Sequence, residues 1–310
     1  MSRHKWRLRS IGLAFGLGLC AWVIWDAVRK SQSLDWPEIP WPQVGLTFAL
    51  VMIAHGLHGL AWVVGARKIA PALGWWDGVG IYSLSFLGRY LPGKIWQVGG
   101  ISVLARGRGA DAIQIAGYSL AFLVAFQVVG ALLLLLAYML DDRPHGWIAC
   151  VIAAPVISIV LAALYRSLAA PVVAVLPYRF QDKLSGAMDQ PFVALALNLF
   201  LLALVWILFG TCGYALAKGF APDWAGSWTQ AAAATLGGLI AGFLVLIAPS
   251  GAGVRESTIS VWLTSVGIAP IAAIALALAL RLAMTVGELI WAAVGAALVI
   301  RPTPPPHPKH

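Results

Sequence analysis

Long apolar blocks alternate with short polar segments along the whole chain. A helix needs about 20 mostly apolar residues to cross the hydrocarbon layer of a bilayer. The pattern predicts an all-α integral membrane protein with about six transmembrane helices. They are expected at about 11–28, 44–66, 112–140, 147–165, 191–217 and 270–300. A basic run opens the first block and no small-residue cleavage site follows it, which indicates a retained span rather than a signal peptide.

Two further apolar stretches, about 77–105 and 228–266, are interrupted near their middle. The interrupting residues are Pro92 and Gly93 in the first stretch, and Pro249, Ser250, Gly251 and Gly253 in the second. Irregular backbone persists at membrane depth only where it is buried in protein or lines a wet cavity. We therefore expect two opposed re-entrant hairpins. The stretch 228–247 is also long enough to span fully, which would place Arg255 and Glu256 in the cytoplasm.

With both hairpins, the chain forms a single polytopic domain, 1–310, with two inverted-repeat-like halves at 1–140 and 141–310. An interrupted helix at matching places in two halves points to the binding site of a transporter. The mixed, amphipathic segment 166–190 is expected to lie on the cytoplasmic surface of the membrane.

Composition agrees with this picture, since 61% of the 310 residues are hydrophobic and 11% are charged. The lysines and arginines give the orientation. Thirteen lie on the N-terminal side, four lie on the other side, and four fall at membrane depth. The first group is Arg3, Lys5, Arg7, Arg9, Arg67, Lys68, Arg106, Arg108, Arg166, Arg179, Lys183, Arg301 and Lys309; the second is Arg29, Lys30, Arg143 and Lys218. This bias predicts cytoplasmic termini in a bacterial-type inner membrane, and it explains the net charge of +9 without a nucleic-acid partner.

The candidate substrate-binding residues are the charged side chains expected at membrane depth. They are Arg89, Lys94, Arg255, Glu256, Arg281 and Glu288. A charge there costs ~2.5–3.5 kcal/mol, so it usually faces a cavity or a partner. Arg281 and Glu288 are seven residues apart and share one helix face. We expect Arg281 to meet Glu256 or a headgroup, and Glu288 to accept a proton.

Helix N-termini after the two prolines are expected to direct partial positive charge towards the same place, which suits an anion. Structural roles stay open beside this one. Arg89 and Lys94 can be ordinary basic anchors at the base of a hairpin. Arg255 and Glu256 can be an ion pair that neutralises only itself.

Other chemistry is not supported by the sequence. Gly88–Lys94 fits a phosphate-loop spacing, but Ile95 replaces the Ser/Thr that would hold Mg²⁺. His55 and His58 share a helix face, but no third ligand accompanies them, so we expect no metal and no cofactor. The three cysteines lie in different apolar blocks, which favours buried packing over a disulfide or zinc site.

The elements GRYLPGKIW at 88–96 and PSGAGVRE at 249–256 resemble motifs of the lysylphosphatidylglycerol synthase transmembrane family, also called flippase-like. The chain has Ser250 and Ala252 where the family more often has Gly and a larger apolar residue. The resemblance spans essentially the whole chain and implies lipid translocation. The aminoacyl-transferring domain of the fused synthases is not expected, because the chain ends ten residues after the last span.

The expected function is therefore that of a lipid flippase, not an enzyme. Its substrate is expected to be an anionic lipid that bears a phosphate, which passes through a central basic cavity. Phospholipids and polyprenyl-phosphate-linked glycolipids both fit, since each presents a phosphate on an apolar tail. One alternative is a non-transporting accessory subunit of an envelope lipid or glycan biosynthesis enzyme. A weaker one is a membrane-embedded transferase that uses Glu256 or Glu288 as a base. The oligomeric state, direction and energy source stay open.

Overall fold

The computed structural model describes residues 36–90, 95–141, 143, 145–174, 181, 190–245 and 249–299. These residues form helices joined by short turns, with no strand among them. Five helices are long and apolar enough to cross a membrane: α2 (Trp41–Ile69), α5 (Ala112–Met139), α6 (Gly146–Ala174), α8 (Phe192–Phe220) and α11 (Pro270–Val299). The chain is an all-helical, multi-pass membrane protein.

The five long helices coincide with five of the six predicted spans, because each span is an uninterrupted apolar block. The predicted first span at 11–28 and the Pro-rich tail lie outside the described residues. The fourth predicted span, 147–165, corresponds to the part of α6 that is apolar enough to cross a membrane, Gly146–Tyr165. The helix itself continues to Ala174, so the beginning of the segment 166–190 is helical. Most of the remainder of that segment is outside the described part.

Both interrupted stretches consist of short helices separated by a break, as predicted. In the first, α3 (Trp75–Leu84) leads into the 3-10 helix η1 (Ser85–Tyr90), and α4 (Ile95–Arg106) follows. Pro92, Gly93 and Lys94 fall between η1 and α4, outside the described residues. In the second, α9 (Trp228–Leu244) is followed by the 3-10 helix η2 (Pro249–Gly251) and α10 (Val254–Ser265).

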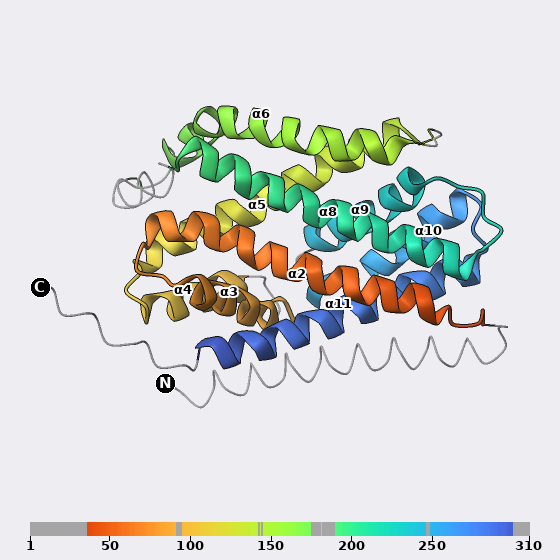
Figure 1. Cartoon of the computed structure of the whole chain (residues 1–310), viewed down its shortest axis with the longest axis horizontal. Coiled ribbons are helices and arrows are strands. Elements are labelled where there is room, and N and C mark those ends of the chain that lie inside the picture. Colours follow the sequence, from red (N-terminus) through yellow and green to blue (C-terminus); the bar gives the residue numbers. More distant parts are fainter. Residues whose placement is uncertain are drawn as a thin grey trace, which may run out of the picture.

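The broken segments flank the last long helix. In Figure 1, α3 and α4 lie near the C-terminal end of α11, while α10 lies near its N-terminal end. η1 and η2 contact each other, and η1 also packs against α11. Gly80 of α3 and Gly295 of α11 allow an especially close approach, since a Cβ on Gly295 would lie 2.5 Å from the Gly80 carbonyl oxygen. Small residues at such crossings are typical of packed membrane helices.

A buried amide joins three of the spanning helices. Asn198 of α8 donates a hydrogen bond from Nδ2 to the Ala61 carbonyl oxygen of α2 at 2.7 Å. The same nitrogen lies 2.9 Å from the Tyr118 hydroxyl oxygen of α5. Tyr118 in turn donates to the Trp62 carbonyl oxygen at 3.0 Å. This network fixes α2, α5 and α8 around the core against which the broken helices pack.

Candidate functional site

The 3-10 helices η1 and η2 contact each other, and η1 packs against α11, the helix that carries Arg281 and Glu288. Five of the six predicted charged residues come together there. We call them the charge network, which consists of Arg89, Arg255, Glu256, Arg281 and Glu288. The sixth, Lys94, lies outside the described residues. The tertiary structure therefore gathers residues from three separate stretches of the chain.

Glu288 is the centre of the first half of the network. Its side chain is only 6% exposed. Arg89 donates from Nη1 to Oε1 at 3.1 Å, and the Tyr90 hydroxyl donates to Oε2 at 2.7 Å. Both donors belong to η1, so the 3-10 turn delivers two adjacent side chains to one carboxylate. Such a buried charge is tolerated because it is both paired and hydrogen-bonded.

Arg89 has several partners within the protein, but its side chain remains partly exposed. Its Nε donates to Oε1 of Gln97 on α4 at 3.2 Å. Its guanidinium lies 4.6 Å from the centre of the Phe86 ring. The side chain is nevertheless 24% exposed, the largest exposed fraction of the charge network. Arg89 is therefore the cation of the network that an incoming anion reaches most easily.

Glu256 is the centre of the second half. Its Oε1 lies 3.4 Å from Arg281 Nη1 and 3.6 Å from Arg255 Nε. The expected meeting of Arg281 with Glu256 is therefore present, and so is the Arg255–Glu256 pair. Arg281 also donates from Nη1 to the Ser250 carbonyl oxygen at 2.9 Å. This contact ties the η2 turn to α11.

One expected helix N-terminus is present after Pro249, because α10 begins at Val254. Glu256 Oε2 accepts a hydrogen bond at 2.7 Å from the amide of Gly253, the residue that precedes α10. A side-chain carboxylate thus bonds one of the amides at the helix end where the sequence analysis expected a substrate anion. The other N-terminus belongs to α4, which begins at Ile95, directly after the residues that are not described.

The segment 250–253, which joins η2 to α10, contains three residues with positive φ. Gly251 and Gly253 have φ of 69° and 84°, and Ser250 has φ of 52°. Only Gly adopts this region without a steric penalty. Gly251 has a second reason to be Gly, since a Cβ there would lie 2.5 Å from the Gly242 carbonyl oxygen of α9. The helix-breaking residues therefore bring η2 against α9 and direct the Ser250 carbonyl towards Arg281.

The charge network has an excess of positive charge. Three arginines face two glutamates, which leaves one unit of positive charge when the neighbouring His55 is neutral. At low local dielectric an uncompensated cation is costly, so one anion would be stabilised beside it.

Sequence reasoning missed two partners of Glu288. Tyr90 lies inside the first motif but was given no role. His55 was considered only as a metal ligand beside His58. In the structure, His55 Nε2 lies 3.6 Å from Glu288 Oε1, while His58 bonds the Tyr82 hydroxyl at 3.0 Å. The described part of the chain brings no three potential metal ligands together. A polar residue on the apolar face of a span was the only available signal for His55.

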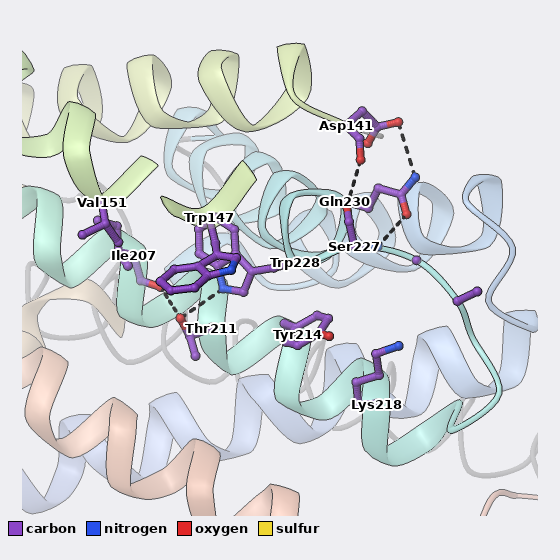
Figure 2. A pocket seen from close by; sticks show the side chains of 12 residues that line it. Asp141, Trp147, Val151, Ile207, Thr211, Tyr214, Lys218, Ser227, Trp228 and Gln230 are labelled. Atoms are coloured by element: carbon purple, nitrogen blue, oxygen red, sulfur yellow. Dashed lines mark hydrogen bonds between the residues drawn. The ribbon is translucent and has the colours of Figure 1, made fainter. Parts of the chain in front are cut away.

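A separate cavity is lined by residues of α6, α8 and α9, by Asp141 and by the loop 225–227 (Figure 2). Its volume is about 840 Å³. Several of its polar side chains have partners within the protein. Trp228 Nε1 donates to Thr211 Oγ1 at 3.2 Å, and Lys218 Nζ donates to the Trp224 carbonyl oxygen at 2.6 Å. None of the five predicted charged residues that the structure describes lines this cavity, so its shape does not by itself identify a substrate site.

Comparisons with protein-family models, with curated proteins and with solved structures found no match. The resemblance to the flippase-like family therefore depends on the motifs at 88–96 and 249–256 alone. Both motifs contribute to the charge network: the first contains Arg89, and the second contains Arg255 and Glu256. The chain is a multi-pass membrane protein in which two interrupted helices converge on a buried, positively charged network.

Proposed function

We propose that this protein is a lipid translocase of the bacterial inner membrane. Its substrate is an anionic lipid with a phosphate headgroup, either a phospholipid or a polyprenyl-phosphate-linked glycolipid. The observation that carries the proposal is the meeting of η1 and η2 beside α11, where three arginines face two glutamates. Isolated charges are rare within membrane helices and usually mark the path of a substrate or an ion.

The proposal includes two re-entrant hairpins that enter from opposite sides of the membrane. α3 has 10 residues, which corresponds to about 15 Å and is half of what a span requires. α9 has 17 residues and ends at Leu244, before the η2 turn. The contact between η1 and η2 supports hairpin tips that meet at membrane depth. This arrangement is typical of transporters with inverted halves, with both termini in the cytoplasm.

In this mechanism, the phosphate first contacts the exposed edge of Arg89. Arg281 and Arg255 supply positive charge next to it, while Glu256 holds both in place. The acyl or prenyl tails remain in the lipid, so only the polar headgroup needs a protein environment. The mechanism involves no chemical change in the lipid. Net transport is driven by a coupled ion or by the gradient of the lipid itself.

Native mass spectrometry combined with lipid exchange tests the proposal. The variant is Arg89→Gln, and its control is Arg106→Gln, which alters an exposed arginine at the end of α4. We expect the wild type and the control to retain one anionic lipid that the Arg89 variant loses. Purified protein in vesicles should accelerate movement of that lipid between leaflets. Protein that accelerates movement of no anionic lipid would refute the proposal.

A second candidate function is an accessory subunit of an envelope-biosynthesis enzyme. It is favoured by the observation that Arg255 and Arg281 already have protein partners, as structural residues would. In that case Arg89→Gln would leave the lipid distribution unchanged in cells and would reduce co-purification with the enzyme. Lipid loss without loss of a protein partner would instead support translocation.

A further inference from the structure

The hydrogen bonds of His55 determine where its ring can hold a proton. His55 is buried in α2, and its Nδ1 lies 2.8 Å from the Val51 carbonyl oxygen. A carbonyl oxygen only accepts hydrogen bonds, so Nδ1 must carry a hydrogen. A neutral His55 would then have a bare lone pair at Nε2. That lone pair faces Oε1 of Glu288 at 3.6 Å.

Glu288 offers the matching position. Its Oε2 accepts from the Tyr90 hydroxyl, and its Oε1 accepts from Arg89. Nε2 and Oε1 are thus two acceptors that face each other with no donor between them. One proton placed between them converts this repulsion into a charge-assisted contact. Phe86 and Phe209 flank the His55 ring edge-on, with centroids at 5.2 and 6.0 Å, which limits the access of water.

We propose that His55 and Glu288 form a proton-binding site whose occupancy decides whether Arg89 can take an anion. This inference rests on the proposed function, and it identifies a proton as the coupled ion. With the proton bound, the His55–Glu288 pair is neutral, and the charge of Arg89 is free to meet a phosphate. Without the proton, the carboxylate of Glu288 neutralises Arg89 and competes with the phosphate for the same Nη1. Anion and proton therefore bind together.

Other titratable groups surround this site, and each has a hydrogen-bond or ion-pair partner other than Nε2 of His55 and Oε1 of Glu288. On α2, His58 bonds the Tyr82 hydroxyl of α3 and lies 4.3 Å from the Phe126 ring. Tyr90 of η1 donates to Glu288, as described above. Arg281 of α11 and Arg255 of α10 are both neighbours of Glu256. None of these contacts places a hydrogen-bond donor between Nε2 of His55 and Oε1 of Glu288.

The direction of the pH effect follows from the charges. Lowering the pH fills the proton site, and this strengthens anion binding. By linkage, anion binding also promotes proton uptake by the same factor. For one linked proton, the affinity for the anion changes by at most about tenfold per pH unit. A proton gradient would then drive the lipid towards the leaflet on the less acidic side.

A spectroscopic test does not depend on lipid transport. In ¹⁵N-histidine-labelled protein, we expect the His55 signals, assigned by their loss in His55→Gln, to show hydrogens on both ring nitrogens. Raising the pH should remove the hydrogen from Nε2 and leave it on Nδ1. In Glu288→Gln, the doubly protonated form should no longer be favoured. A His55 ring that lacks the Nδ1 hydrogen, or that titrates identically in Glu288→Gln, would overturn the proposal.

The functional test uses phosphatidylcholine vesicles that contain tail-labelled phosphatidylglycerol. In the wild type we expect binding to tighten as the pH falls, and an imposed proton gradient to move the label. Glu288→Gln mimics the protonated carboxyl group and should reduce the pH dependence of binding to less than about twofold. His55→Gln should lose the response to the gradient, whereas His58→Gln, one turn away, should keep it.

The outcomes separate this inference from the proposed function. The label can move while lipid binding by the wild type does not depend on pH and transport does not respond to the gradient. That result would refute the proton site and would support translocation. If no label moves under any condition, translocation of this lipid is refuted, and the ring protonation still decides whether the proton site exists. Inorganic phosphate is added as a competitor. Displacement of the labelled lipid by phosphate would show that a phosphate alone is recognised, and no displacement would show that the whole lipid is required.

Discussion

Gly251 and Gly253 offer a pair of substitutions, since Gly251 is the last residue of η2 and Gly253 precedes α10. Both have positive φ, at 69° and 84°. Gly253 combines its φ with a ψ of −49°, which lies outside the left-handed helical region. An alanine at either position is therefore strained, at a cost of about 1–3 kcal/mol. They differ in their surroundings. A Cβ at 253 meets nothing within 4 Å, whereas a Cβ at 251 would lie 2.5–2.7 Å from three backbone atoms of Gly242.

The structure therefore predicts different losses of stability. Gly253→Ala should lower the free energy of unfolding by the cost of backbone strain alone, about 1–3 kcal/mol. Gly251→Ala adds the cost of overpacking, typically about 1–3 kcal/mol, because backbone atoms of α9 must move. The total loss for Gly251→Ala is about 2–6 kcal/mol. Displacement of η2 should also disturb the contact between the Ser250 carbonyl and Arg281.

Equilibrium unfolding in mixed micelles of dodecyl maltoside and sodium dodecyl sulfate measures both losses. The wild type and the two variants are compared at the same lipid content, so that bound lipid does not shift the comparison. Gly251→Ala should be the less stable variant by at least about 1 kcal/mol. Equal losses in the two variants would show that η2 does not pack against Gly242, and they would refute the close approach of α9 and η2 on which the site depends.

Three further outcomes are expected. Ser250→Gly should raise the free energy of unfolding by about 1 kcal/mol in the same assay, because Ser250 occupies left-handed backbone; a loss would show that the hydroxyl has a role of its own. Asn198→Leu should lower it by about 1–3 kcal/mol, since Tyr118 and a buried carbonyl lose their donor; a change within measurement error would contradict this network. In a cysteine-free background, Gly109→Cys should react with an impermeant maleimide only from the cytoplasmic side, and Asp223→Cys should react only from the opposite side. The reverse labelling pattern would refute the predicted orientation.

Much of the architecture is a direct consequence of the hydrophobic pattern. In a bilayer every backbone polar group must be paired internally, so an apolar block of about 20 residues has few alternatives to a helix. This is why the spans at 112–140 and 191–217 coincide closely with α5 and α8. The helix breaks were also predictable, because Gly and Pro are local signals. The end of α6 was not, since the polar residue Arg166 does not by itself end a helix.

The candidate site was only partly predictable. The high cost of charge at membrane depth singled out Arg89, Arg255, Glu256, Arg281 and Glu288 from the sequence alone. The neighbours expected for Glu256, Arg255 and Arg281, are both present in the structure. The sequence analysis did not foresee that this carboxylate also accepts a hydrogen bond from the Gly253 amide at the start of its own helix.

The sequence by itself determined that this protein is a bundle of membrane helices with two interruptions and a few costly charges. Those properties depend on neighbours along the chain and on transfer from water to lipid. The tertiary structure alone decided which charges meet. Arg89 and Glu288 are 199 residues apart in the chain, and their pairing requires η1 to lie against α11. His55 acquired its partner in the same way, because the packing of α2 against α11 places Nε2 opposite Oε1. Contacts between distant segments depend on side-chain packing across several helices, which no local pattern encodes.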